Sequence, residues 1–137
     1  LIGQYAHGNE PSHHIAYMFN VAGQPKKTQY WIDRILQTQY NTTPNGLSGN
    51  EDCGQMSAWY IWSAMGLYPM NPASTEYQFG RPLFDKVTMH LPNGKNVSKD
   101  NKYIKSVTFN GKAYNQWYIS HQELLNGGEL VFEMTNK

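Results

Sequence analysis

The chain has 137 residues and a formal net charge of +1, with 14% aromatic and 15% charged residues. This length suffices for one hydrophobic core, so one domain is the first expectation and two small ones are the alternative. The near-neutral charge argues against a nucleic acid or an anionic membrane as partner, and no apolar run approaches the roughly 20 residues that span a bilayer. The single cysteine, Cys53, excludes an intrachain disulfide.

The first part of the chain has helical periodicity. Residues 12–21 carry apolar side chains at helical spacing, and Ala22 and Gly23 supply a stop. A second helix is predicted to begin at Pro25, because proline is tolerated at the first helical position. Its predicted apolar face holds Tyr30, Trp31, Ile35 and Leu36, and the largely opposite face holds Lys26, Lys27, Asp33 and Arg34.

A third helix is predicted over about residues 54–67, and it is apolar on nearly every side. A helix with so little polar surface is expected to be buried between neighbours. Three helices cannot supply those neighbours, and the chain opens at Leu1 without an initiator methionine. We therefore expect further helices upstream, in a longer protein of which this chain is a piece.

From residue 71 the pattern changes to short runs with a period of two, separated by turns. Strands are predicted over residues 76–79, 83–91, 103–109, 112–114 and 129–133, with turns at 92–94 and 110–111 and one helical turn at 121–124. The sequence thus predicts an α+β fold. Helices occupy residues 1–70, and an antiparallel β-rich segment occupies residues 71–137.

Two oxygen-rich loops lead into predicted helices. Asn9 and Glu10 precede Pro11, and residues 50–52, Asn-Glu-Asp, precede the third helix. Carboxylate and amide oxygens suit a hard cation such as calcium, and a pair of carboxylates suits glycoside hydrolysis. Simple helix capping by Glu10 and Asp52 is an equally open alternative. The spacing along the chain does not decide whether the loops converge.

Other candidate sites are weaker. His7, Glu10, His13 and His14 do not have the spacing of a di-iron or zincin site, and histidines beside a loop commonly form hydrogen bonds instead. Cys53 is expected to be a small buried side chain rather than a nucleophile. Trp117 and Tyr118 could stack on a sugar ring, but packing against a sheet is the expectation we favour.

Residues 8–14, 49–60 and 66–69 resemble the C-terminal signatures of glycoside hydrolase family 92. Residues 77–84 and 127–132 are similar to the family as well, so the resemblance spans nearly the whole chain. Several long motifs in the same order make it specific. The resemblance implies the last helices of an (α/α)₆ toroid, followed by a C-terminal antiparallel β unit.

The resemblance further implies a calcium-dependent, exo-acting α-mannosidase that inverts the anomeric centre of N-glycan or mannan chains. Asp52 matches the base of the family, and Asn50 corresponds to a second acidic position where an amide could orient water. Asn9 and Glu10 match residues associated with Ca²⁺, which holds the mannose 2- and 3-hydroxyls. His13 is implied to bind substrate.

The family's catalytic acid belongs to an upstream tryptophan-rich motif that has no counterpart in this sequence. The resemblance therefore implies that the chain packs against the N-terminal part of its parent and that the isolated piece is inactive. It also implies a periplasmic or extracellular location. A noncatalytic carbohydrate-binding or scaffold module, with the aromatic residues as its sugar platform, is the alternative function.

Overall fold

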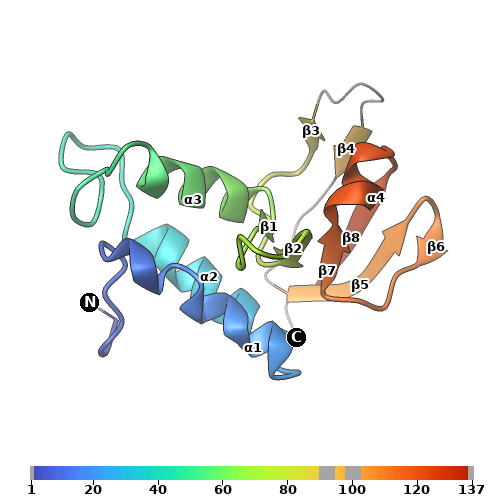
Figure 1. The fold of residues 1–137 in the computed structure, drawn as a ribbon, viewed down its shortest axis with the longest axis horizontal. Coiled ribbons are helices and arrows are strands. Elements are labelled where there is room, and N and C mark those ends of the chain that lie inside the picture. The colour runs from blue at the N-terminus through green and yellow to red at the C-terminus, as the bar shows by residue number, and fades with distance from the viewer. Residues whose placement is uncertain (1, 90–94, 98–102, 136–137) are drawn as a thin grey trace.

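A computed structural model describes residues 2–89, 95–97 and 103–135 (Figure 1). Three helical segments lie on one side of the molecule, and most of the strands lie on the other. All strand pairs within the described residues are antiparallel. The predicted mixture of helices with antiparallel sheets is therefore confirmed, whereas the toroid and the division at residue 70 stay predictions. None of the helices in this part of the chain is long and apolar enough to cross a membrane.

The first predicted helix is broken into short turns. The 3₁₀ turns η1 (Glu10–Ser12) and η2 (Ile15–Tyr17) precede a short α1 (Met18–Val21). The prediction of one continuous helix is wrong because the backbone carbonyl of His13 accepts a hydrogen bond from the indole of Trp59 at 3.1 Å. The N–H of Tyr17 then bonds the carbonyl of His14, three residues back, at 3.0 Å. A tertiary contact has replaced an intrahelical one.

Helix α2 (Pro25–Thr38) begins at the predicted proline and buries Ile32, Ile35 and Leu36. Two predictions about its faces are wrong. Tyr30 is exposed, and Asp33 is only 5% exposed because Arg81 covers it, with Nε of Arg81 3.2 Å from Oδ1 of Asp33. The partner lies 48 residues further along the chain, so periodicity within the helix could not reveal it.

Helix α3 (Gln55–Ala64) buries Met56, Trp59, Ser63 and Ala64. The opposite face is open in this chain, since Ser57 and Ala58 are exposed and Ile61 is 55% exposed. Within the described residues the helix is covered on one side only, and the prediction that upstream helices cover the rest stays a prediction. An apolar helix with one bare side is a surface on which further structure can pack.

The strands form three small sheets. Strands β1 (Leu67–Tyr68), β2 (Glu76–Phe79) and β7 (Tyr118–Ser120) pair in the order β1-β2-β7. Strand β3 (Val87–Met89) pairs with β4 (Lys95–Val97), and β5 (Tyr103–Phe109) lies between β6 (Lys112–Ala113) and β8 (Leu130–Thr135). Strands β2 and β5 match their predictions. Strand β3 is shorter than the predicted 83–91, of which residues 90 and 91 lie outside the described residues, as do residues 92–94 of the predicted turn.

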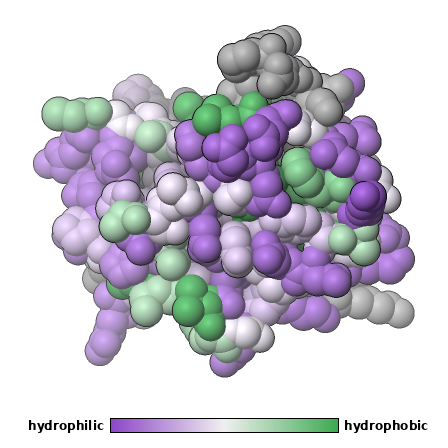
Figure 2. Space-filling view, turned by 45° about the vertical axis from the view of Figure 1, so that its right-hand side comes forward, coloured by the Kyte–Doolittle hydropathy of each residue, from purple (hydrophilic) through white to green (hydrophobic). Residues whose placement is uncertain are grey.

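Strands β1, β4 and β7 were missed, because two or three residues are too few to establish a period. The predicted helical turn is α4 (His121–Leu125), which Ser120 and Glu123 begin with a reciprocal capping box. On the face in Figure 2, apolar side chains are interspersed with polar ones instead of forming one continuous patch.

Two apolar clusters make the core. The helical cluster holds Ala16, Tyr17, Ile32, Ile35, Leu36 and Trp59. The sheet cluster holds Leu67, Phe79, Ile104, Val107, Ile119, Leu130, Phe132 and Met134, with Trp117 packed against it as predicted. Buried amides join the two: Nδ2 of Asn20 donates to the carbonyl of Phe79 at 2.8 Å, and Oε1 of Gln29 accepts from the N–H of Ile104 at 2.7 Å.

Replacing Asp33 by alanine in the intact protein should lower the free energy of unfolding by about 3–5 kcal/mol, because Arg81 is left as an unpaired, largely buried cation. Glu133→Ala is the matched control, because it breaks an exposed ion pair. The side chain of Lys105 is 61% exposed and that of Glu133 is 56% exposed. Thermal or denaturant unfolding should show a large shift for Asp33→Ala and almost none for Glu133→Ala. Equal shifts would contradict the buried role of Asp33.

Candidate active site

The two oxygen-rich loops meet backbone to backbone at a pair of glycines. A Cβ on Gly8 would lie 2.3 Å from the carbonyl oxygen of Ser48, and one on Gly49 would lie 3.1 Å from Cα of Gly8. No side chain fits at either position without moving one loop away from the other. The convergence that the sequence left open is therefore present in the fold, and it needs glycine on both sides.

The loops bring two carboxyl groups together. A hydrogen-bonding contact joins the side chains of Glu10 and Asp52. This bond, followed by the negative charge of Glu10, raises the pKa of Asp52. The pKa of Glu10 is lowered, first by a hydrogen bond from its own backbone and then by Asp52. The pKa values of the two carboxyls are thus shifted in opposite directions, upward for Asp52 and downward for Glu10.

Glu51 caps α3, which leaves the carboxyl of Asp52 for Glu10. Oε1 of Glu51 accepts from the N–H of Ser57 at 2.9 Å, and its other oxygen accepts from the N–H of Gly54. Hydrogen bonds from Ser57 accordingly lower the pKa of Glu51. Helix capping, the alternative considered for Asp52, is therefore performed by the preceding residue.

The backbone between this cap and the helix is left-handed at three consecutive residues. The φ angles are 48° at Asp52, 57° at Cys53 and 91° at Gly54. Such angles are unfavourable for residues other than glycine and persist where the surroundings impose them. Cys53 is exposed on this turn, so the expectation that it is a small buried side chain is wrong.

Behind the carboxyls lies a buried cluster of His7, His13 and Trp59. The rings of His7 and His13 stack at 4.7 Å, and Trp59 meets His7 edge-on at 4.3 Å. Burial, followed by the proximity of His13, lowers the pKa of His7 to about 3, so His7 is neutral at physiological pH. Its Nδ1 lies 2.8 Å from the hydroxyl of Tyr5 and its Nε2 lies 2.6 Å from that of Tyr40.

The described structure locates each predicted site residue. Glu10 and Asp52 touch, while Asn9 and Asn50 are exposed on the same two loops. Nδ2 of Asn9 donates to Oγ of Ser12 at 2.9 Å. His13 is only 2% exposed, with Nε2 2.9 Å from the carbonyl oxygen of His7 and Nδ1 3.1 Å from Nε2 of Gln55. The sequence reading missed Gln55, for which its place three residues after Asp52 was the available signal.

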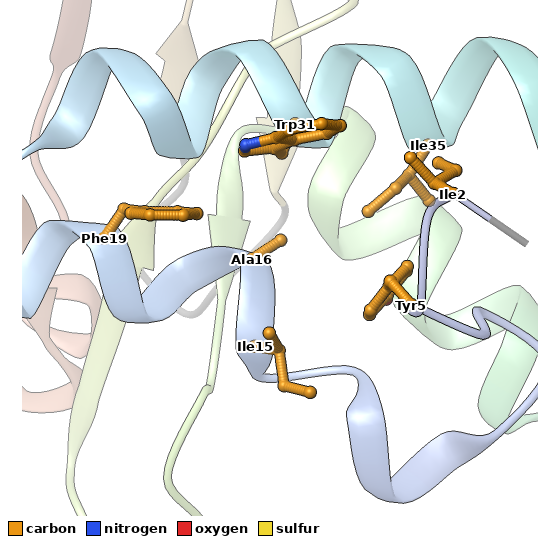
Figure 3. A pocket seen from close by; sticks show the side chains of 7 residues that line it. All are labelled: Ile2, Tyr5, Ile15, Ala16, Phe19, Trp31 and Ile35. Atoms are coloured by element: carbon orange, nitrogen blue, oxygen red, sulfur yellow. The ribbon is translucent and has the colours of Figure 1, made fainter.

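An apolar groove of about 190 Å³ opens on the helical side of the chain (Figure 3). Ile2 and Tyr5 reach it from the N-terminal segment, Trp31 and Ile35 from α2, and the remaining lining residues are Ile15, Ala16 and Phe19. Ile15 itself is 45% exposed. The groove offers almost no polar atoms with which a sugar could bond.

The sequence model of the glycosyl hydrolase family 92 catalytic domain matches residues 1–136. The chain belongs to this family. A family 92 α-mannosidase of Bacteroides thetaiotaomicron, also solved in complex with mannoimidazole, is 41% identical with a TM-score of 0.93 and is matched by all of this chain. A family 92 inverting mannosidase of the same species, strain VPI-5482, is 45% identical with a TM-score of 0.91 over 99% of the chain.

This chain is much shorter than the proteins that it matches. It covers 19% of each of these two mannosidases. An "uncharacterized secreted glycosidase" of Arthroderma benhamiae is 35% identical over 133 residues, which are 90% of this chain and 17% of that protein. The chain thus spans about a fifth of the length of the proteins that it matches.

Replacing Gly8 by alanine should destabilise the intact protein, because the new Cβ would meet the backbone oxygen of Ser48 and separate the loops. Gly3→Ala is the control: its φ is 60°, but no atom lies within 4 Å of an added Cβ, so it measures backbone strain alone. Thermal unfolding should show a greater loss of stability for Gly8→Ala. Equal losses would contradict the role of the glycine contact.

Proposed function

We propose that this chain supplies part of the active site of a calcium-dependent, inverting, exo-acting α-mannosidase that hydrolyses terminal α-mannosides of N-glycans or mannan. The observation that carries the proposal is the contact between the carboxyls of Glu10 and Asp52, formed by two distant loops in a family 92 chain. The mannosidases that it resembles support the substrate class, and the description of one of them as inverting supports the stereochemistry.

Asp52 is proposed as the general base. It would take a proton from a water molecule while the oxygen of that water attacks the anomeric carbon on the face opposite the leaving oxygen. A carboxylate whose pKa is raised by a neighbouring carboxyl is a better proton acceptor than an unperturbed one. Asn50, two residues earlier on the exposed loop, is proposed to orient the same water through its amide.

Glu10 cannot be the acid that serves this base. The acid and base of an inverting glycosidase stand about 6.5–9.5 Å apart, with room for water and substrate between them. The carboxyls of Glu10 and Asp52 are in hydrogen-bond contact instead. We therefore propose that the acid, which protonates the leaving oxygen, comes from another part of the parent protein.

Asn9 and Glu10 are proposed to hold Ca²⁺. Oε1 of Glu10 is buried without a hydrogen-bond partner among the described residues, and an unpaired anionic oxygen fits a hard cation. Asn9 uses its amide nitrogen on Ser12, and its carbonyl oxygen is the atom that suits a cation. Bound calcium would supply a fixed point for the sugar hydroxyls. No group of three or more His, Cys, Asp and Glu suited to a metal occurs in the described part, so further ligands would come from elsewhere.

For His13, proposed from the resemblance to bind substrate, direct contact of the ring with a sugar would cost one of its two hydrogen bonds. The apolar groove of Figure 3 and the bare side of α3 are proposed to pack against the remainder of the parent chain, which in the similar mannosidases is about four-fifths of the protein. We propose that the parent acts in the periplasm or outside the cell, in line with the secreted relative.

In the intact enzyme, Asp52→Asn should abolish nearly all release of mannose from α-mannosides, because an amide cannot accept the proton of water. Glu51→Gln is the matched control, since that neighbouring carboxylate caps α3 and should affect thermal stability more than turnover. Release of α- or β-mannose, followed by NMR, measures both rate and stereochemistry. Full activity of Asp52→Asn would sink the assigned role.

A chelator should also remove the activity of the intact enzyme, and added Ca²⁺ should restore it. A second measurement uses binding: the 137 residues alone should bind mannosides weakly or not at all, because the rest of the pocket lies elsewhere. Tight binding by this piece would favour the noncatalytic carbohydrate-binding module. Activity that persists after complete chelation would contradict the calcium dependence.

A further inference from the structure

The two loops that carry the carboxyls are joined a second time, by one pair of side chains. Nδ1 of His13 lies 3.1 Å from Nε2 of Gln55. The backbone N–H of His13 donates to the carbonyl of Glu10 at 3.0 Å, and that of Gln55 donates to the carbonyl of Asp52 at 3.1 Å. Each partner is therefore tied to the carboxyl-bearing residue three positions before it, and the side-chain bond closes a ring of contacts around the site.

The hydrogen bonds of His13 determine which ring nitrogen carries the proton. An amide nitrogen only donates, so Nδ1 of His13 must accept from Gln55 and carry no proton. Nε2 therefore carries the proton and donates it to the carbonyl of His7 at 2.9 Å. The backbone carbonyl of His13 accepts a hydrogen bond from the indole N–H of Trp59. With its ring stacked on that of His7, His13 is held from every side.

The loop that carries Asp52 needs contacts of this kind to hold its conformation. Asp52 and its two successors have left-handed backbones, a conformation that returns to more favourable angles unless neighbouring contacts prevent it. Gln55 is the first residue of α3 and the first after that turn. Its side chain also hydrogen-bonds Tyr68. The amide thus has a fixed partner on each side, and through its backbone it holds the carbonyl of Asp52.

We propose that His13 and Gln55 form a positioning pair that sets the separation and relative orientation of the Glu10 and Asp52 carboxyls. The inference rests on the proposed function, in which Asp52 is the base. Neither residue touches the reacting atoms in this role; both act through the loops that they hold together. Small displacements matter in such a site, because misplacing a reacting group by about 1 Å can cost about 100-fold in rate.

Two substitutions of His13 separate positioning from simple stability. The amide oxygen of asparagine can take the place of Nδ1 and accept from Gln55, whereas the amide of glutamine reaches the place of Nε2 and bonds only the carbonyl of His7. Both changes remove the same ring from the same buried site. His13→Gln should lower kcat about 10- to 100-fold with little change in KM, and His13→Asn should retain much more of kcat.

Gln55→Met tests the other half of the pair, since methionine has a similar length and no N–H to donate. It should lower kcat as His13→Gln does, and the double variant should be no worse than either single one, because the pair acts as a unit. Tyr68→Phe is the matched control. It removes the hydroxyl that Gln55 bonds but keeps the bond to His13, and it should leave kcat near that of the unaltered enzyme.

These measurements use the intact enzyme, with melting temperatures recorded for every variant. The pair would be rejected if His13→Asn and His13→Gln lost kcat in proportion to stability, or if the two losses in the double variant simply multiplied. A rise in KM alone would assign Gln55 to substrate binding and also overturn the proposal. Failure of the proposed function looks different, since Asp52→Asn would then leave the activity intact whatever these variants do.

Discussion

The candidate site depends on the direct contact between the backbones of Gly8 and Gly49. Two loops that are about forty residues apart meet there with no side chain between them, since an added Cβ would collide with backbone on either side. The pairing of the two carboxyls depends on this approach. The carboxyls of Glu10 and Asp52 can contact each other because the loops that carry them are held close together.

The contact is supported from behind by the buried cluster around Trp59. The indole N–H of Trp59 donates a hydrogen bond to the carbonyl of His13, and this bond has a local and a long-range consequence. Locally, it occupies the carbonyl at the break in the predicted helix, where the 3₁₀ turn η2 precedes a short α1. Globally, it attaches the loop of Glu10 to the helix that follows Asp52. Helix α3 is therefore connected to both loops. Its first turn is capped by Glu51, and Trp59 in its middle bonds the loop that carries Glu10.

The helical side of the chain leaves apolar surface exposed. Helix α3 leaves Ile61 exposed, and the apolar groove between α2 and the N-terminal segment has nothing packed in it. The strands, by contrast, close their own cluster around Phe79, Phe132 and Ile119. Membership of family 92 and the fifth of a relative's length that the chain covers account for this asymmetry. The helical side thus leaves apolar surface uncovered, whereas the strands enclose an apolar cluster of their own.

The sequence by itself determined the features that arise within a few residues. Proline at the start of α2, the alternating runs of β2 and β5, and the loop motifs of residues 8–14 and 49–60 carried the secondary structure and the family. These signals are readable because propensity, turn chemistry and alternation act over neighbours in the chain. The same signals brought Glu10 and Asp52 forward as candidates. They could not tell a capping carboxylate from a catalytic one.

Only the tertiary structure decided which carboxylate caps α3, since the N–H groups at the start of that helix bond Glu51 and the carboxyl of Asp52 contacts Glu10. It likewise buried Asp33 against Arg81 and diverted the carbonyl of His13 to Trp59, 46 residues away. Asp33 and His13 are buried, and burial removes water as an alternative partner. A distant side chain that matches such a group prevents the cost of leaving it unpaired, and no pattern of neighbouring residues can reveal that side chain.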